Sequence, residues 1–97
     1  LIMADRPFDA IFCASDLIAI GAMRALADAG RRVPQDVAVV GFDDQPAASL
    51  TSPPLTTVAQ DARRAGEMLV DTLLAQLRGQ APAPVALPAR LVVRGSS

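Results

Sequence analysis

Two short apolar runs separated by one helical pattern constrain this chain more than any other feature of its sequence. Residues 9–14 (DAIFCA) and 37–42 (VAVVGF) are apolar without alternation, which is typical of strands covered on both faces. Between them, apolar residues recur at helical spacing from Asp16, Ser15 is a suitable N-cap, and Gly30 is a suitable C-terminal stop. A strand, a helix and a strand in this order predict a βαβ unit with parallel strands.

The second half of the chain continues the alternation of strand and helix patterns. Residues 45–54 are rich in Ala, Ser, Thr and Pro and predict a surface loop, and residues 55–58 predict a short strand. Asp61 then caps a predicted helix with an apolar stripe. Residues 80–84 (QAPAP) indicate a stiff linker, and residues 85–93 indicate extended structure. The resulting order β-α-β-β-α-β predicts an α/β protein.

The composition of the 97-residue chain supports one compact core and excludes several classes of protein. With 52% hydrophobic residues and a net charge of −1, the chain lacks the signature of disorder. No apolar run is long enough to span a membrane, and the near-neutral charge provides no basic face for nucleic acid. We therefore expect no membrane partner, and DNA contact only through another segment. The single Cys13 forms no internal disulfide and fits a reducing, cytoplasmic compartment.

Two pairs of polar residues follow the predicted strands. Ser15 and Asp16 lie where the first strand becomes a helix, and Asp43 and Asp44 directly follow the second strand. In open parallel sheets, ligands bind outside the carboxyl ends of the strands. A carboxylate can accept two hydrogen bonds from adjacent hydroxyls, so a sugar or another polyol is a natural ligand for Asp43. Gln60 precedes the second helix and could face the same cleft. Helix capping and turn formation are the alternative roles of these residues.

Catalysis and metal binding find little support in these residues. The chain has no histidine and no lysine, so Ser15 or Cys13 has no base that would activate it as a nucleophile. Adjacent side chains of an extended segment point to opposite faces, which places Asp43 and Asp44 poorly as an acid and base pair. Metal ligation is restricted to a weak oxygen site at the same two aspartates. We expect neither an enzyme nor a protein that requires a cofactor.

Four segments, taken in order and with their spacing, resemble the LacI/GalR family of bacterial transcription regulators: FCASDLIAIGAMRAL, VPQDVAVVGFDDQPAA, PPLTTVAQD and LPARLVVRGS. The resemblance is to the carboxyl-terminal part of the effector-binding domain and extends from about Asp9 to Ser96. It implies an α/β fold with a partial three-layer parallel sheet of the periplasmic-binding-protein-like type. It also implies a small-molecule effector, with a sugar as the default, and DNA binding through an amino-terminal helix-turn-helix outside this chain.

The resemblance also implies roles for individual residues. Ser15, Asp16, Asp43 and Gln60 match residues that line the effector cleft, although Ser15 stands where many members have Asn. The helix over residues 16–29 and the loop over residues 46–52 resemble the dimer-forming surface. The residues expected at that surface are Leu17, Ile20, Met23, Pro46 and Ser52. We therefore expect a homodimer, or an oligomer in which an element is exchanged between copies.

The domain organisation implied by the resemblance is a single partial effector-binding domain over residues 1–97. Residues 9–59 form the carboxyl-terminal lobe, and residues 60–79 form a helix that packs in a lobe missing from this chain. Residues 80–84 are a linker, and residues 85–97 are a return strand. We expect such a chain neither to bind operator DNA nor to close fully around an effector.

Two other functions are weighed against that of a repressor domain. A sugar-binding protein for transport is the alternative, since it is built on the same fold. The double aspartate after VVGF and the LPARLVVR ending favour the regulators. An enzyme ranks third, because bases and metal ligands are missing.

Overall fold

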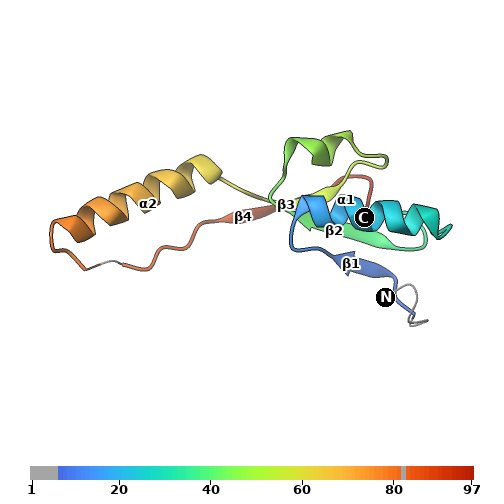
Figure 1. Ribbon diagram of the computed structural model, residues 1–97, viewed down its shortest axis with the longest axis horizontal. Helices are drawn as coiled ribbons and strands as arrows, with labels where there is room; N and C mark the ends of the chain where they lie inside the picture. Colours follow the sequence, from blue (N-terminus) through green and yellow to red (C-terminus); the bar gives the residue numbers. More distant parts are fainter. Residues whose placement is uncertain (1–6, 82) are drawn as a thin grey trace. The chain divides into compact units, whose positions relative to one another are not determined.

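The structure is a computed structural model that describes residues 7–81 and 83–97 (Figure 1). Its elements follow the predicted α/β order, with a short 3₁₀ helix, η1, added where a loop was expected. Their bounds are β1 Ala10–Phe12, α1 Asp16–Asp28, β2 Ala38–Phe42, η1 Pro46–Leu50, β3 Thr56–Gln60, α2 Ala62–Leu77 and β4 Ala89–Val92. The chain divides into two compact units. The first contains the residues up to Ala59 together with Arg90–Ser97, and the second is Gln60–Ala89.

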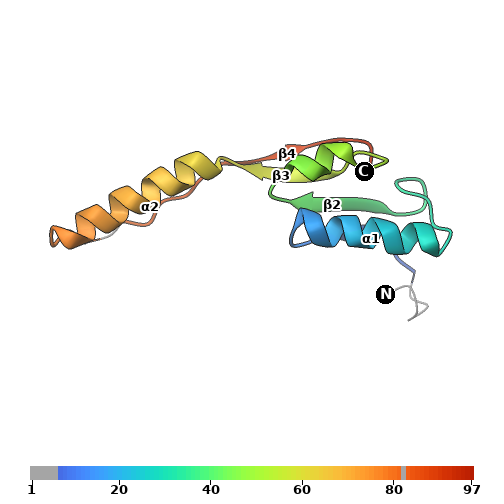
Figure 2. The same ribbon diagram turned by 45° about the horizontal axis from the view of Figure 1, so that its top comes forward.

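The sheet has the strand order β1-β2-β3-β4. β1 pairs with β2 in parallel, which confirms the predicted βαβ unit, and β3 also pairs with β2 in parallel. β3 and β4 are neighbours in the sheet, and Figure 2 shows these two strands side by side. The segment that follows β4 lies against the start of β3. In this segment the Ser96 amide donates to the Pro54 carbonyl, and the Arg94 amide donates to the Thr56 hydroxyl. These hydrogen bonds hold the carboxyl-terminal segment in place within the first unit.

The core of the first unit lies between α1 and β2. Helix α1 begins as predicted, because the Ser15 hydroxyl accepts a hydrogen bond from the Ile18 amide at 3.2 Å. The left-handed conformation of Gly30, with φ of 72°, follows its last turn. The face of α1 that packs on the sheet carries Asp16, Ala19, Met23 and Leu26. These residues recur at helical spacing, so one stripe of α1 makes the core.

The expectation that both apolar runs are covered on both faces is wrong in detail. Phe12 in β1 is 67% exposed, because it lies on the face of β1 opposite to Ile11, which packs against the core. In β2, Val39 and Gly41 are buried, whereas Ala38, Val40 and Phe42 are only partly buried. This alternation arises because α1 covers one face of β2 (Figure 1).

The second unit consists of α2 and the extended segment that follows it. Asp61 caps α2 as predicted, since its carboxylate accepts a hydrogen bond from the Arg64 amide at 3.0 Å. No residue of α2 is buried, and its apolar side chains at Leu69, Leu73 and Leu77 are exposed. The predicted strand over residues 85–93 is shorter than expected, because β4 begins only after Pro88. Within residues 7–81 and 83–97, no helix has the length and apolar content needed to cross a membrane.

Candidate functional site

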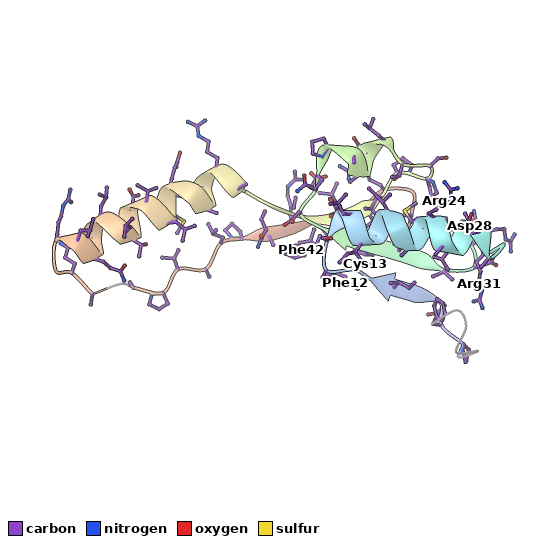
Figure 3. The ribbon with its side chains drawn as sticks, in the orientation of Figure 1. Phe12, Cys13, Arg24, Asp28, Arg31 and Phe42 are labelled. Carbon is purple, nitrogen blue, oxygen red and sulfur yellow. The ribbon has the colours of Figure 1, made fainter. Side chains whose placement is uncertain are left out.

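The candidate site lies at the edge of the sheet where the parallel strands end. Figure 3 shows Phe12, Cys13 and Phe42 together at this edge, whereas Arg24 and Asp28 lie at the opposite end of α1. Because β1 and β2 are parallel, the residues that follow each strand emerge on the same edge. This is the place where ligands bind in open α/β sheets. The predicted polar pairs after β1 and β2 both reach it.

Ser15 lies at the start of this edge and is partly buried. Its hydroxyl accepts a hydrogen bond from the Ile18 amide, so the capping role is present in the structure. The hydroxyl proton remains a donor that a ligand could use. Contact between Ser15 and an effector stays a prediction.

Asp16 is fully buried and joins three elements of the first unit. One carboxylate oxygen accepts a hydrogen bond from the Thr57 hydroxyl at 2.6 Å, and the other accepts from the Gln45 amide at 2.6 Å. Gly41 makes room for this arrangement, because a Cβ atom there would overlap the Asp16 carboxylate. Burial leaves the carboxylate no surface for a ligand in this conformation. Asp16 therefore holds β3 and the loop after β2 against the start of α1.

Asp43 and Asp44 form a strained turn directly after β2. Their φ values are 108° and 55°, in a region that side chains other than glycine seldom occupy. The Asp43 amide donates to the Val58 carbonyl at 2.8 Å, and the Asp44 amide donates to the Thr57 hydroxyl at 3.3 Å. The Asp43 side chain is exposed, whereas that of Asp44 is partly buried. Strain of this kind persists where the surroundings hold it, and it is common at binding sites.

Arg94 is a part of this site that the sequence analysis missed. Its guanidinium donates through Nη2 to Asp44 Oδ1 at 2.8 Å and through Nη1 to the Leu55 carbonyl at 2.9 Å. Thr57, which lies between Asp16 and the Asp44 amide, was missed as well. Arg94 and Thr57 bond residues that are 13 to 50 positions away in the sequence, so no local pattern could have identified either of them. The available signal was an arginine directly after an apolar terminal segment.

Gln60 is the last residue of β3, and its side chain is exposed. It is also the first residue of the second unit. Its contact with an effector stays a prediction.

The residues predicted for a dimer surface divide into exposed and buried ones. Leu17 is 76% exposed, and Pro46 and Ser52 are also exposed. Ile20 is partly buried against the core. Met23, whose place at a dimer surface stays a prediction, is only 8% exposed and packs in the core. The reason is the helical period, which aligns Met23 with Ala19 and Leu26 on the face that packs against β2.

The thiol of Cys13 has the environment of a core residue. Cys13 is buried in the hydrophobic core, and this burial raises the pKa of its thiol. A raised pKa disfavours the reactive thiolate. Over residues 7–81 and 83–97, no three His, Cys, Asp or Glu side chains gather in a way that could hold a metal ion.

These observations define a class of protein: an α/β unit that presents an exposed carboxylate and a capping hydroxyl at the carboxyl edge of parallel strands. The family model described as the periplasmic binding protein-like domain matches residues 1–97. The chain belongs to this family, in the LacI/GalR branch that contains bacterial transcription regulators.

One curated relative and two solved structures illustrate the similarity. The HTH-type transcriptional regulator MalR of Streptomyces coelicolor is 49% identical over 96 residues, which are 95% of this chain and 27% of the relative. The Lac repressor dimer bound to operator and the anti-inducer ONPF has a TM-score of 0.90 at 41% identity, with 99% of this chain and 34% of that chain covered. The complex of the regulator CelR with cellobiose has a TM-score of 0.85 at 42% identity, with 94% and 28% covered. The chain spans about a quarter of the length of MalR and of two further regulators that it matches, and 81% of the length of a lactose operon repressor from Rhizobium radiobacter that is 42% identical to it.

Proposed function

We propose that this chain is the effector-binding and dimerisation part of a bacterial transcriptional repressor that responds to a small sugar. The observation that carries the proposal is the exposed carboxylate of Asp43 on a strained turn at the carboxyl edge of the sheet. A carboxylate in this position can accept hydrogen bonds from two adjacent sugar hydroxyls. The similarity to regulators that include a cellobiose complex supports a sugar as the effector class. A cytoplasmic location is part of the proposal.

The proposal assigns different roles to the four residues predicted for the effector site. Asp43 accepts from the effector, and Ser15 and Gln60 contribute weaker polar contacts. Asp16 acts by positioning, because both of its carboxylate oxygens are already occupied by Thr57 and Gln45. A transport protein is the less favoured alternative, since the matched relatives named above are regulators.

We also propose that α2 packs in a lobe formed by residues outside this chain, as the predicted boundaries at residues 60–79 require. The exposed leucines of α2 support this proposal, because an apolar helix face is stable in water only when it is covered. DNA contact then belongs to another segment of the protein. Dimerisation is expected through the exposed residues Leu17, Pro46 and Ser52. Ile20 is partly buried and contributes only its exposed part to this surface.

The test is a titration of the complete protein with cellobiose and lactose by isothermal titration calorimetry. We expect one of these or a related disaccharide to bind, and Asp43→Asn to weaken binding about ten- to a hundredfold. That range corresponds to the loss of a hydrogen bond to a charged group. Asp71→Asn, on the exposed surface of α2, is the matched control and leaves the affinity unchanged. Equal affinity of Asp43→Asn and the wild type would overturn the assignment of Asp43.

A further inference from the structure

The turn formed by Asp43 and Asp44 is held in place from three directions. The Asp43 amide donates to the Val58 carbonyl in β3, and the Asp44 amide donates to the Thr57 hydroxyl. The amide of the next residue, Gln45, donates to the buried Asp16 carboxylate. Two successive left-handed residues other than glycine are unfavourable by themselves, so these contacts must maintain the turn.

The Asp44 side chain supplies a further contact, and it differs from the other ion pairs. Its carboxylate is 27% exposed and the Arg94 side chain is 21% exposed, which makes this pair the least exposed in the described part of the chain. Less exposed pairs are screened less by water and salt. The pair also joins positions 50 residues apart, whereas the other four pairs link neighbours along a helix or turn.

Arg94 is itself fixed before it reaches Asp44. Its backbone amide donates to the Thr56 hydroxyl at 2.8 Å, and its Nη1 donates to the Leu55 carbonyl at 2.9 Å. Its guanidinium therefore has a defined position relative to β3, and the planar fork directs Nη2 toward Asp44. Asp44 has its carboxylate engaged in this way, while that of Asp43 is exposed. The two adjacent aspartates have different environments and can have different tasks.

We propose that Asp44 and Arg94 are a positioning pair whose ion pair holds the turn so that Asp43 presents its carboxylate to the effector. This inference rests on the proposed function, since it names the residues that orient the effector-binding carboxylate. Asp44 does not contact the effector. Loss of either partner removes one of the contacts that hold the strained turn, so the turn relaxes more often and displaces Asp43.

The experiment compares Asp44→Asn, Arg94→Gln and the double variant in the complete protein. Hydrogen exchange of the amides of residues 43–45 reports on the turn, because all three are hydrogen-bonded in the structure. Binding of cellobiose and lactose reports on Asp43. Asp28→Asn removes the exposed ion pair with Arg24 and serves as the matched control. Exchange at Met23 and Leu26, in the core of α1, detects any variant that has unfolded as a whole.

We expect each single variant to raise exchange at residues 43–45 about tenfold and to weaken sugar binding about tenfold, with no change in the core of α1. A tenfold effect corresponds to about 1.4 kcal/mol, at the lower end for a hydrogen bond to a charged group. The double variant should be no worse than the more severe single one, because the two residues act through one contact. Arg94→Lys should raise the exchange and weaken sugar binding less than Arg94→Gln does, since lysine keeps the charge but lacks the planar fork of the guanidinium.

The outcomes separate this inference from the proposed function. Unchanged exchange at residues 43–45 in both single variants overturns the positioning role, whatever the sugar affinity. Faster exchange with unchanged sugar affinity overturns it too, because the turn would then not orient the binding carboxylate. If the wild type binds neither sugar nor any related disaccharide, the proposed function fails, and the effector part of the inference fails with it. The exchange data then decide only whether the pair holds the turn.

Discussion

Asp16→Ala should be the most damaging of the substitutions considered for the first unit. The carboxylate is fully buried and accepts two hydrogen bonds of 2.6 Å, from the Thr57 hydroxyl and the Gln45 amide. A hydrogen bond to a charged group contributes about 1.5–3 kcal/mol, so the loss of both removes about 3–6 kcal/mol. A carboxylate in the first turn of α1 adds about 0.3–1 kcal/mol through the helix dipole. Together these contributions give an expected loss of about 3–7 kcal/mol, which is a large share of the stability of a typical domain.

Asp16→Asn separates the charge from the shape of the side chain. The amide oxygen can still accept one of the two hydrogen bonds, and the Thr57 hydroxyl can rotate to accept from the new NH₂ group. We therefore expect about half the loss of the alanine variant. The Gln45 amide is the more demanding partner, because a backbone N–H can only donate.

The assay is urea unfolding of the purified protein, followed by circular dichroism, with Asp28→Ala as the control. Asp28 is exposed and pairs with Arg24 on the surface of α1, so its loss should cost less than about 0.5 kcal/mol. The midpoints should move while the slope stays constant, which indicates a change in stability alone. A midpoint for Asp16→Ala that matches the Asp28→Ala control would refute the reasoning.

Three further predictions concern the packing and ionisation of the first unit. Gly41→Ala should cost about 1–3 kcal/mol in urea unfolding because its Cβ overlaps the Asp16 carboxylate, whereas Gly21→Ala, with open space around it, should be neutral or stabilising. The Cys13 thiol, whose pKa is raised by burial, should react with iodoacetamide at pH 8 far more slowly in the folded protein than in urea; equal rates would contradict its burial. Hydrogen bonds from the side chain and backbone of Arg32 lower the pKa of Asp36 from 3.8 to about 2. The associated stabilisation is therefore present above about pH 4 and is lost as the pH falls through about 2, and Arg32→Gln should return the pKa toward 3.8 in a carboxyl titration by NMR.

The local features of the fold could be predicted from the sequence because they depend on residues close together in the chain. The caps at Ser15 and Asp61 each bond an amide three residues away, and Gly30 has the left-handed φ that follows a helix end. The parallel pairing of β1 with β2 followed from the βαβ order. Each of these inferences needs only composition, spacing and the handedness of the chain.

The burial of Met23 shows what spacing alone does not determine. The sequence shows that α1 is amphipathic, but several apolar stripes fit it, and Leu17 and Met23 were assigned to the same surface. In the structure the core stripe contains Asp16, so a charged residue lies on the buried face. Hydrophobicity alone could not have identified that stripe, because the burial of Asp16 depends on partners 29 and 41 residues away.

The two polar pairs show the same limit at the candidate site. Sequence reasoning placed Ser15, Asp16, Asp43 and Asp44 at one edge of the sheet, and the structure places them there. Within each pair, one residue is engaged by the protein and the other keeps polar surface, and this division depends on Thr57 and on Arg94, which come from distant parts of the chain. The proposed site uses both kinds of residue, since the exposed Asp43 carboxylate is oriented only when engaged neighbours hold its strained turn. The position of such a site is therefore readable from strand order, whereas the role of each polar residue requires the tertiary contacts that fix its neighbour.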